Sequence, residues 1–262
     1  MSDRQLVFGD DRSADADHVW GWIDGHDWPR WRISVVTAKM PGAPDEGLHP
    51  WEPDEPRALS RPGAGTVVEH LAAAGDPRDV LESCRDADLL AVGPRGTGRL
   101  KAMVLGSTTE ALLSARPALP ALAIIRSAAP TRHILLFADG SDHAQRAADL
   151  LAEMPWIGHC RVTVLGLVDG VSDTEGGIAR AVAALEGTGA DVETQKSGAL
   201  RGTYTMDVKS VLLDLIAEAQ PDLVTVGTRG LSGIRRMLLG STARTIANYA
   251  QCSTLITHAG DD

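Results

Sequence analysis

Short apolar runs alternate along the chain with segments in which apolar residues recur every three or four positions. In the second half, "HILLFADGS" (133–141) is an apolar run that ends in a turn, and "DHAQRAADLLAEM" (142–154) follows it with helical spacing. Two further β-branched runs, "RVTVLGLV" (161–168) and "DLVTVG" (222–227), are typical of buried strands. The pattern predicts strands that alternate with helices.

The rest of the second half completes this alternation. The segment "ADVETQKSG" (190–198) is more polar, which favours a strand near the edge of a sheet. Residues 208–219 have the pattern of an amphipathic helix that Pro221 ends, and another helix is expected from about Ser241, before the strand "STLIT" (253–257). Alternating strands and helices indicate the α/β class, with a mainly parallel sheet covered by helices on both faces.

The first half follows the same order of elements. Its expected strands and helices are "QLVFGDD" (5–11), "DADHVWGWI" (15–23), "RISVVTA" (32–38), "GTVVEHLA" (65–72), "DPRDVLESC" (76–84), "DLLAVG" (88–93), "STTEALLSA" (107–115) and "ALAII" (121–125). A Pro- and Gly-rich stretch without periodicity, residues 40–65, interrupts this order, and we interpret it as a loop. The junction around Pro130 separates two expected domains, residues 1–128 and 130–262.

A glycine-rich stretch occurs twice in register. "VGPRGTGRLKAMVLGSTTEALLSA" starts at Val92, and "VGTRGLSGIRRMLLGSTARTIANYA" starts at Val226. Gly93 and Gly227 are 134 residues apart, as are Gly106 and Gly240. Self-similarity at so long a period indicates two tandem domains rather than a solenoid.

Composition and charge narrow the classes of function. The chain has 262 residues, a net charge of −10 and three scattered cysteines without a C-x-x-C pair. The acidic balance argues against a general nucleic-acid or anionic-membrane binder, because both need a basic face. The dispersed histidines predict no protein-bound metal site. The start of the sequence lacks a secretory pattern and no apolar stretch reaches 18 residues, so a cytoplasmic location is expected.

The glycine stretches have the chemistry of an anion site. A Gly-rich turn at the carboxyl end of a parallel strand, followed by a helix, offers bare backbone, free amides and the positive end of the helix dipole. Neither stretch is a P-loop, and both follow the fourth strand rather than the first, unlike the dinucleotide fingerprint. Ser107 with Glu110 also has the spacing of a capping box, so Ser107 is either a cap or a ligand contact.

The spacing of both stretches, G-2x-G-9x-G-(S/T), resembles that of the universal stress protein family. "FADGSDHAQRAADLLA", from Phe137, resembles the family's opening after strand one, and "FGDDRSADADHVWGW", from Phe8, resembles it more loosely. The resemblance covers nearly the whole chain as two tandem domains of the ATP-binding branch. It implies two Rossmann-like domains, each with a five-stranded parallel sheet in the order 3-2-1-4-5. The implied ligand is ATP, or AMP or ADP, with Mg²⁺ accompanying ATP.

The resemblance also implies where the nucleotide lies: near the acid after strand one, the end of strand two, and the glycine loop with its Ser/Thr pair. In the second half the matching residues are Asp139, Val168, Gly227, Arg229, Gly230, Gly240, Ser241 and Thr242. In the first half they are Asp11, Val36, Gly93, Arg95, Gly96, Gly106, Ser107 and Thr108.

The first half departs from the pattern in two places. Arg12 stands where the second half has Gly140, and Pro94 stands where it has Thr228, which removes one amide donor. If only one half binds nucleotide, we therefore expect it to be the second.

Several residues have structural alternatives. Asp139 in Asp-Gly-Ser is also an ordinary turn residue. The basic pairs Arg99/Lys101 and Arg235/Arg236 suit a polyphosphate or a solvated loop. The five tryptophans of the first half favour core or interface packing over base stacking.

We expect a nucleotide-binding regulatory protein of the stress response, without catalytic residues, because no nucleophile–base pair or paired carboxylates stand out. Two alternatives stay open: a partner-binding module in which the glycine loops are structural, and, with less support, an adenylyl-transferring enzyme. The halves are expected to pack as a pseudo-symmetric pair, and the sequence leaves open whether two chains form a homodimer.

Overall fold

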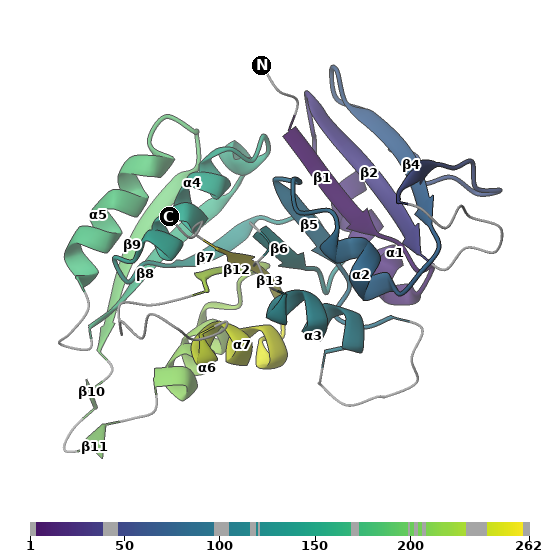
Figure 1. Ribbon diagram of the computed structural model, residues 1–262. Helices are drawn as coiled ribbons and strands as arrows, with labels where there is room; N and C mark the ends of the chain where they lie inside the picture. Colours follow the sequence, from purple (N-terminus) through teal and green to yellow (C-terminus); the bar gives the residue numbers. More distant parts are fainter. Residues whose placement is uncertain are drawn as a thin grey trace. The chain divides into compact units, whose positions relative to one another are not determined.

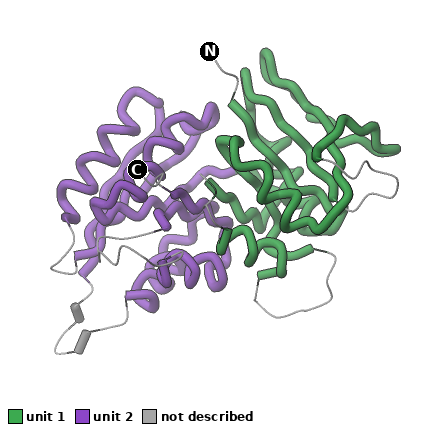
Figure 2. The backbone as a smooth tube through the Cα atoms, in the orientation of Figure 1, with its two compact units in different colours: residues 1–130 green, residues 131–262 purple. Residues whose placement is uncertain are grey.

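The chain folds into two compact units, Met1–Pro130 and Thr131–Asp262 (Figure 2). The computed structural model describes residues 4–38, 47–96, 105–115, 119, 121–168, 173–198, 200–201, 204–205, 208–228 and 240–258. Among these residues, no helix combines the length and the apolar character that crossing a membrane requires.

The first unit contains a parallel sheet in the order β4-β2-β1-β5-β6 (Figure 1). In chain order its parallel strands are β1 (Arg4–Gly9), β2 (Trp31–Ala38), β4 (Val67–Ala73), β5 (Leu89–Val92) and β6 (Ala121–Ile124). Its helices are α1 (Ala14–Asp24), α2 (Pro77–Glu82) and α3 (Ser107–Ser114). Numbered within the unit, the five parallel strands have the order 3-2-1-4-5, as the sequence analysis predicted.

The second unit has the same sheet order, β9-β8-β7-β12-β13. Its parallel strands are β7 (His133–Phe137), β8 (Arg161–Val168), β9 (Asp191–Gly198), β12 (Leu223–Gly227) and β13 (Ser253–Thr257). Its helical segments are α4 (Asp142–Ala152), η1 (Ile157–His159), α5 (Thr174–Leu185), α6 (Val208–Ala219) and α7 (Ser241–Tyr249), and β10 (Leu200–Arg201) pairs with β11 (Tyr204–Thr205). Helices α4 and α5 pack together, as do α6 and α7.

Burial explains why these segments form strands at these places in the sheets. Strands β5 and β6 are buried at every residue, as continuous apolar runs of a sheet covered on both faces are, and β13 is buried at every residue as well. Strand β9 is mostly exposed and lies at the sheet edge of its unit, which confirms the prediction made from its polar sequence. Hydrophobic patterning thus indicates which segments are buried strands and which strand lies at an edge, whereas the order 3-2-1-4-5 was implied by the family resemblance.

The connection between the second and third parallel strands differs between the units. In the second unit this connection contains α5, which the sequence analysis did not predict. In the first unit, the described residues 47–66 contain only the short strand β3 (His49–Pro50), which pairs antiparallel with β4. The loop interpretation of residues 40–65 is thus correct for the described part.

Tryptophans fill the core of the first unit. Trp22, Trp28 and Trp31 are buried, and Trp28 meets each of the other two edge-to-face, with ring centroids 5.6 and 5.2 Å apart. The indole N–H of Trp28 donates to the backbone oxygen of Ile23 at 2.8 Å. These contacts confirm the packing role over base stacking for these side chains.

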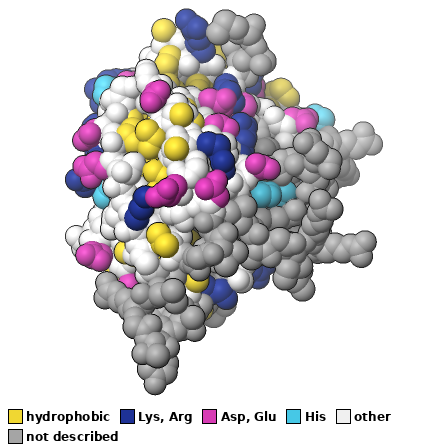
Figure 3. Space-filling view, turned by 90° about the vertical axis from the view of Figure 1, so that its left-hand side faces the viewer, with side chains coloured by type: hydrophobic (Ala, Val, Ile, Leu, Met, Phe, Trp, Pro, Cys, Tyr) yellow, Lys and Arg dark blue, Asp and Glu magenta, His cyan; other side chains and the backbone are white. Residues whose placement is uncertain are grey.

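Charged side chains are mixed on the face of the molecule that Figure 3 shows. Acidic and basic groups alternate there, and the described side chains in this view form no continuous basic patch. Polyanions such as nucleic acids are bound by such patches, so the described part of this face offers them no extended surface.

Candidate functional site

In the second unit, the turn after β7 is fixed by two side-chain caps. The Asp139 carboxylate accepts a hydrogen bond from the Ser141 amide at 2.9 Å, and the Ser141 hydroxyl accepts one from the Ala144 amide at 3.2 Å. Gly140 has a φ of +81°, which a residue without Cβ adopts freely. Asp139 therefore has the turn role given as its alternative, and it lies at the carboxyl end of the sheet.

The first unit builds the same turn with a strained residue. The Asp11 carboxylate accepts from the Ser13 amide at 3.0 Å, and the Ser13 hydroxyl accepts from the Ala16 amide at 3.1 Å. Arg12 takes the place of Gly140 with a φ of +59°, a conformation that disfavours a side chain. Its guanidinium lies 3.2 Å from the carboxylate of Asp10. The substitution thus adds a cation, which pairs with a buried acid.

The first glycine of each motif allows a strand to approach a helix closely. A Cβ on Gly227 would lie 2.6 Å from the backbone carbon of His143 on α4. A Cβ on Gly93 would lie 2.8 Å from the Cβ of Asp15 on α1 and 3.1 Å from its backbone carbon. Since carbon atoms do not approach so closely, both positions require glycine for packing alone.

The later glycines close the loop and start the next helix. The Gly106 amide donates to the Pro94 oxygen at 2.8 Å, and the Gly240 amide donates to the Thr228 oxygen at 2.6 Å. A Cβ on Gly106 would come within 3.2 Å of the Arg95 Cα. In both units the residue before the helix, α3 or α7, is therefore hydrogen-bonded to the residue that follows the first glycine of the motif.

Helices α3 and α7 start without a side-chain cap. Their N-cap residues are Gly106 and Gly240, so Ser107 and Ser241 are the first helical residues. The capping-box interpretation of Ser107 with Glu110 is therefore wrong, because a capping serine would have to stand one position earlier. Thr108 and Thr242 follow in the first turns, where backbone amides lack partners within the helix.

Some candidate residues cannot be placed. Arg229 and Gly230 lie outside the described residues, as do Arg99, Lys101, Arg235 and Arg236. Gly96 is described, and a Cβ there would collide with the Asp11 carboxylate. In the first unit the glycine loop and the turn acid are thus brought together.

The two strand-two candidates occupy different positions. The Asp10 amide donates to the Val36 oxygen at 2.9 Å, and the Ala138 amide donates to the Leu165 oxygen at 2.9 Å. The counterpart of Val36 is therefore Leu165, and Val168 lies three residues further on. Val36 is buried, whereas Val168 is 45% exposed at the end of β8. The assignment of Val36 and Val168 as equivalent residues is wrong.

A charged cluster in the first unit was missed by the sequence analysis. The Asp10 side chain is fully buried, and the Arg57 guanidinium donates to its two oxygens at 3.0 and 3.1 Å. The same guanidinium donates to Asp17 at 2.7 Å, and the Arg57 amide donates to His70 Nε2 at 2.9 Å. Burial, together with the nearby cation of Arg12, lowers the pKa of His70. Arg57 comes from the Pro-rich loop, where no sequence pattern points to a contact.

A second missed contact holds the glycine loop of the first unit. The Arg95 amide donates to the Asp15 carboxylate at 3.1 Å, and the Arg95 Nε lies 3.7 Å from the same oxygen. The corresponding residue of α4 is His143, whose Nδ1 lies 3.0 Å from the hydroxyl of Thr228. Equivalent positions thus hold an anion in one unit and an imidazole in the other.

The sequence of the second half matches a known family. The model of the universal stress protein family matches residues 130–258. The second half of the chain belongs to the universal stress protein family. No curated protein sequence matches the chain significantly.

Solved structures of universal stress proteins share the fold along nearly the whole chain. One from Archaeoglobus fulgidus DSM 4304 is 15% identical with a TM-score of 0.65, and the match covers 99% of this chain and 100% of the other. A putative universal stress protein from Pseudomonas aeruginosa UCBPP-PA14 is 13% identical with a TM-score of 0.52, covering 97% and 93%. A universal stress protein in complex with cAMP is 25% identical with a TM-score of 0.39, covering 49% and 97%. At these identities, the two long matches show the fold of a chain with two such units.

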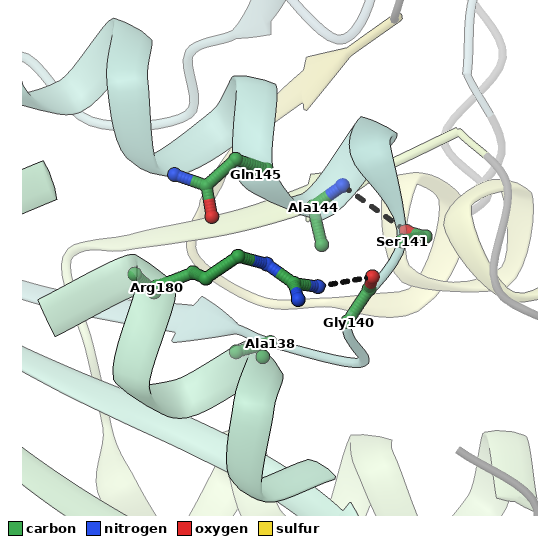
Figure 4. Close-up of a pocket in the computed structure, with 8 residues that line it drawn as sticks. Ala138, Gly140, Ser141, Ala144, Gln145 and Arg180 are labelled. Carbon is green, nitrogen blue, oxygen red and sulfur yellow. Dashed lines mark hydrogen bonds between the residues drawn. The ribbon is translucent and has the colours of Figure 1, made fainter. Parts of the chain in front are cut away.

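The universal stress protein domain has a shallow depression beside its first turn, lined by residues of this turn, α4 and α5. Figure 4 shows Arg180 of α5 extending along this depression, where its Nη2 donates to the Gly140 oxygen, and Gln145 of α4 lies nearby. The Arg180 side chain is 48% exposed and its Nη1 lies 3.8 Å from Asp173. The turn is therefore held by a cation that remains accessible to solvent.

Proposed function

We propose that the second unit binds an adenine nucleotide, ATP, ADP or AMP, and that the protein acts as a nucleotide-dependent regulator of a stress response. The observation that carries this proposal is the uncapped amino terminus of α7, which directly follows the glycine motif of a universal stress protein domain. Free amides and the helix dipole at such a terminus favour a phosphate.

The topology supports placing the nucleotide across two neighbouring strand ends. Strands β7 and β12 pair in parallel, so the Asp139 turn and the loop after Gly227 lie at the same edge of the sheet. This is the point where the chain order of the strands reverses, and open α/β sheets bind ligands there. Asp139 would face the adenosine, and Gly240, Ser241 and Thr242 would face the phosphates. Mg²⁺ would accompany ATP as a counterion of the phosphates.

A binding role is preferred over catalysis. Among the described residues of this edge, the Asp139 carboxylate is engaged in its turn and the His143 imidazole lies against Thr228. Neither arrangement supplies a base aimed at a water beside the phosphates. We therefore propose a regulator whose response is set by nucleotide occupancy.

A second candidate is a partner-binding module with purely structural glycine loops. The close approaches at Gly93, Gly227 and Gly106 favour it, because packing alone accounts for glycine at these positions. The two candidates differ in whether the loop before α7 holds a ligand.

Titration calorimetry of the nucleotide-stripped chain separates them. ATP with Mg²⁺, ADP, AMP and cAMP would each be titrated into the wild type, into Gly240→Val and into the matched variant Gly106→Val. We expect binding that Gly240→Val abolishes and Gly106→Val leaves, and circular dichroism checks that each variant is folded. Absence of heat with every nucleotide would favour the partner-binding module.

A further inference from the structure

We infer that side chains of the first unit block its nucleotide site, chiefly the Arg57 side chain, which occupies the carboxyl end of the sheet. Each chain then binds one nucleotide, in the second unit. The closure itself stands on the geometry of the first unit alone. Only the count of one nucleotide per chain rests on the function proposed above.

Arg57 reaches the edge of the sheet where a ligand would enter. It belongs to the connection between β2 and β4, and its side chain is 14% exposed. Its guanidinium lies over the end of β1, where it binds both oxygens of Asp10, and it reaches Asp17 on α1. The backbone of the segment is tied down as well, through the Arg57 amide to His70 and the Ser60 amide to Asp24.

The Arg57 side chain is held in this position because its partner, Asp10, is a buried acid. The Asp10 side chain has no exposed surface, so withdrawing Arg57 would leave a carboxylate whose remaining cation is Arg12. An uncompensated buried charge is strongly unfavourable. In the second unit the equivalent residue is Ala138, and the arginine of the corresponding connection, Arg180, binds a backbone oxygen. The second unit therefore lacks this buried ion pair.

A backbone donor of the glycine loop in the first unit is already bound by a carboxylate of the chain itself. The Asp15 carboxylate accepts the Arg95 amide, a donor of the glycine loop that would otherwise face a phosphate. Pro94, in contrast, removes no ligand donor, because the amide of its counterpart Thr228 donates to the Thr257 oxygen; the expectation that this proline weakens the site is wrong. An entering phosphate would have to displace a carboxylate that is part of the chain.

Charge around the turn reinforces this difference between the units. Positions 10, 11, 15 and 17 of the first unit are all aspartate, and their counterparts are Ala138, Asp139, His143 and Gln145. The first turn of α4 adds one further acid, Asp142. In the first unit these carboxylates hold Arg12, Arg57 and Arg95 in ion pairs, so a phosphate would have to compete with the chain's own acids for each of these cations.

The closure is tested by counting sites on the full, nucleotide-stripped chain with ATP and Mg²⁺. We expect one site in the wild type and none in Gly240→Val. The variant Asp10→Ala/Asp15→His/Arg57→Ala, which takes the residues of the second unit at positions 10 and 15, is expected to bind two. Two sites in the wild type, or one site in the folded triple variant, would overturn the closure.

Hydrogen exchange gives a readout that needs no nucleotide. In the wild type, the Arg57 amide should exchange about 100-fold more slowly than an unprotected amide, and Asp10→Asn should remove most of this protection. The Ala144 amide of the second unit, bound to Ser141, is the internal control in both proteins. Rapid exchange of the Arg57 amide hydrogen in the wild type would contradict the proposed closure of the first unit. If no nucleotide binds any variant but Arg57 is protected, the proposed function fails and the closure stands.

Discussion

Removing the Arg57 guanidinium should destabilise the first unit far more than a surface ion pair would. The Arg57→Ala variant loses two hydrogen bonds to a carboxylate without solvent exposure and one to Asp17, which is 63% exposed. Breaking one partner of a buried pair costs about 3–5 kcal/mol, and an exposed pair contributes under about 1 kcal/mol. Arg12, 3.2 Å from Asp10, retains part of the compensation. We therefore expect a loss near the lower end, about 3 kcal/mol.

The tryptophans make this loss measurable in the presence of the second unit. Five of the six tryptophans, Trp20, Trp22, Trp28, Trp31 and Trp51, lie in the first unit. Urea unfolding followed by tryptophan fluorescence thus reports mainly on this unit, and the free energy of unfolding follows from linear extrapolation.

Two control variants separate the buried charge from lost packing. Asp17→Asn should lower the free energy of unfolding by under about 1 kcal/mol, because Arg57 retains its ion pair with Asp10. Asp10→Ala/Arg57→Ala should be more stable than Arg57→Ala alone, because it removes the orphaned carboxylate. The reasoning is refuted if Arg57→Ala stays within about 0.5 kcal/mol of the wild type, or if the two single losses simply add.

Two further predictions concern a glycine and the pH dependence. Gly227→Ala should destabilise the second unit by about 1–3 kcal/mol, because the new Cβ would lie 2.6 Å from the backbone of α4. Urea unfolding followed by circular dichroism measures this loss, and an unchanged free energy of unfolding would contradict the packing role of Gly227. Burial lowers the pKa of His70 and of His133 below the ordinary value of 6.5, so the unfolded state takes up protons first as the pH falls. Stability should be complete above about pH 6.5 and decrease below it, and the decrease seen in the thermal melting temperature should be smaller in His70→Gln; an equal decrease would exclude His70.

Most strands were predictable because their patterns extend over whole segments, and their order was implied by the resemblance to the universal stress protein family. Buried runs such as β5 and β6 are apolar at every position, and β9 is polar where it lies at an edge. Helix α5 was not predicted because Gly176 and Gly177 weaken its helical propensity, although Ile178, Ala181 and Leu185 are buried on one side. Patterning therefore predicts an element best when no residue in it contradicts the pattern.

Site residues were predictable only where the backbone fixes them. Asp11 and Asp139 follow directly from a strand end and a turn, and both lie there. Val168 lies at the end of its strand as predicted, but the counterpart of Val36 is Leu165, which only the register identifies because a strand end has no residue-specific mark. Arg57 lies 47 residues from Asp10 in a segment without periodicity, so only the folded chain brings them together.

In both units, the connection between the second and third parallel strands contacts the end of the first strand. The units differ in the group that this contact binds. In each unit an arginine from the connection between the second and third parallel strands reaches the turn after this strand, Arg57 in one and Arg180 in the other. Arg180 donates to the neutral oxygen of Gly140 and lies 3.8 Å from the exposed carboxylate of Asp173, and it stays half exposed, so an anionic ligand can compete for it. Arg57 is committed to the buried charge of Asp10, and a ligand phosphate would have to outcompete a carboxylate that cannot leave. The aspartate that replaces alanine after strand one, with an arginine in reach, is therefore the difference between the units on which the proposed closure of the first unit mainly rests.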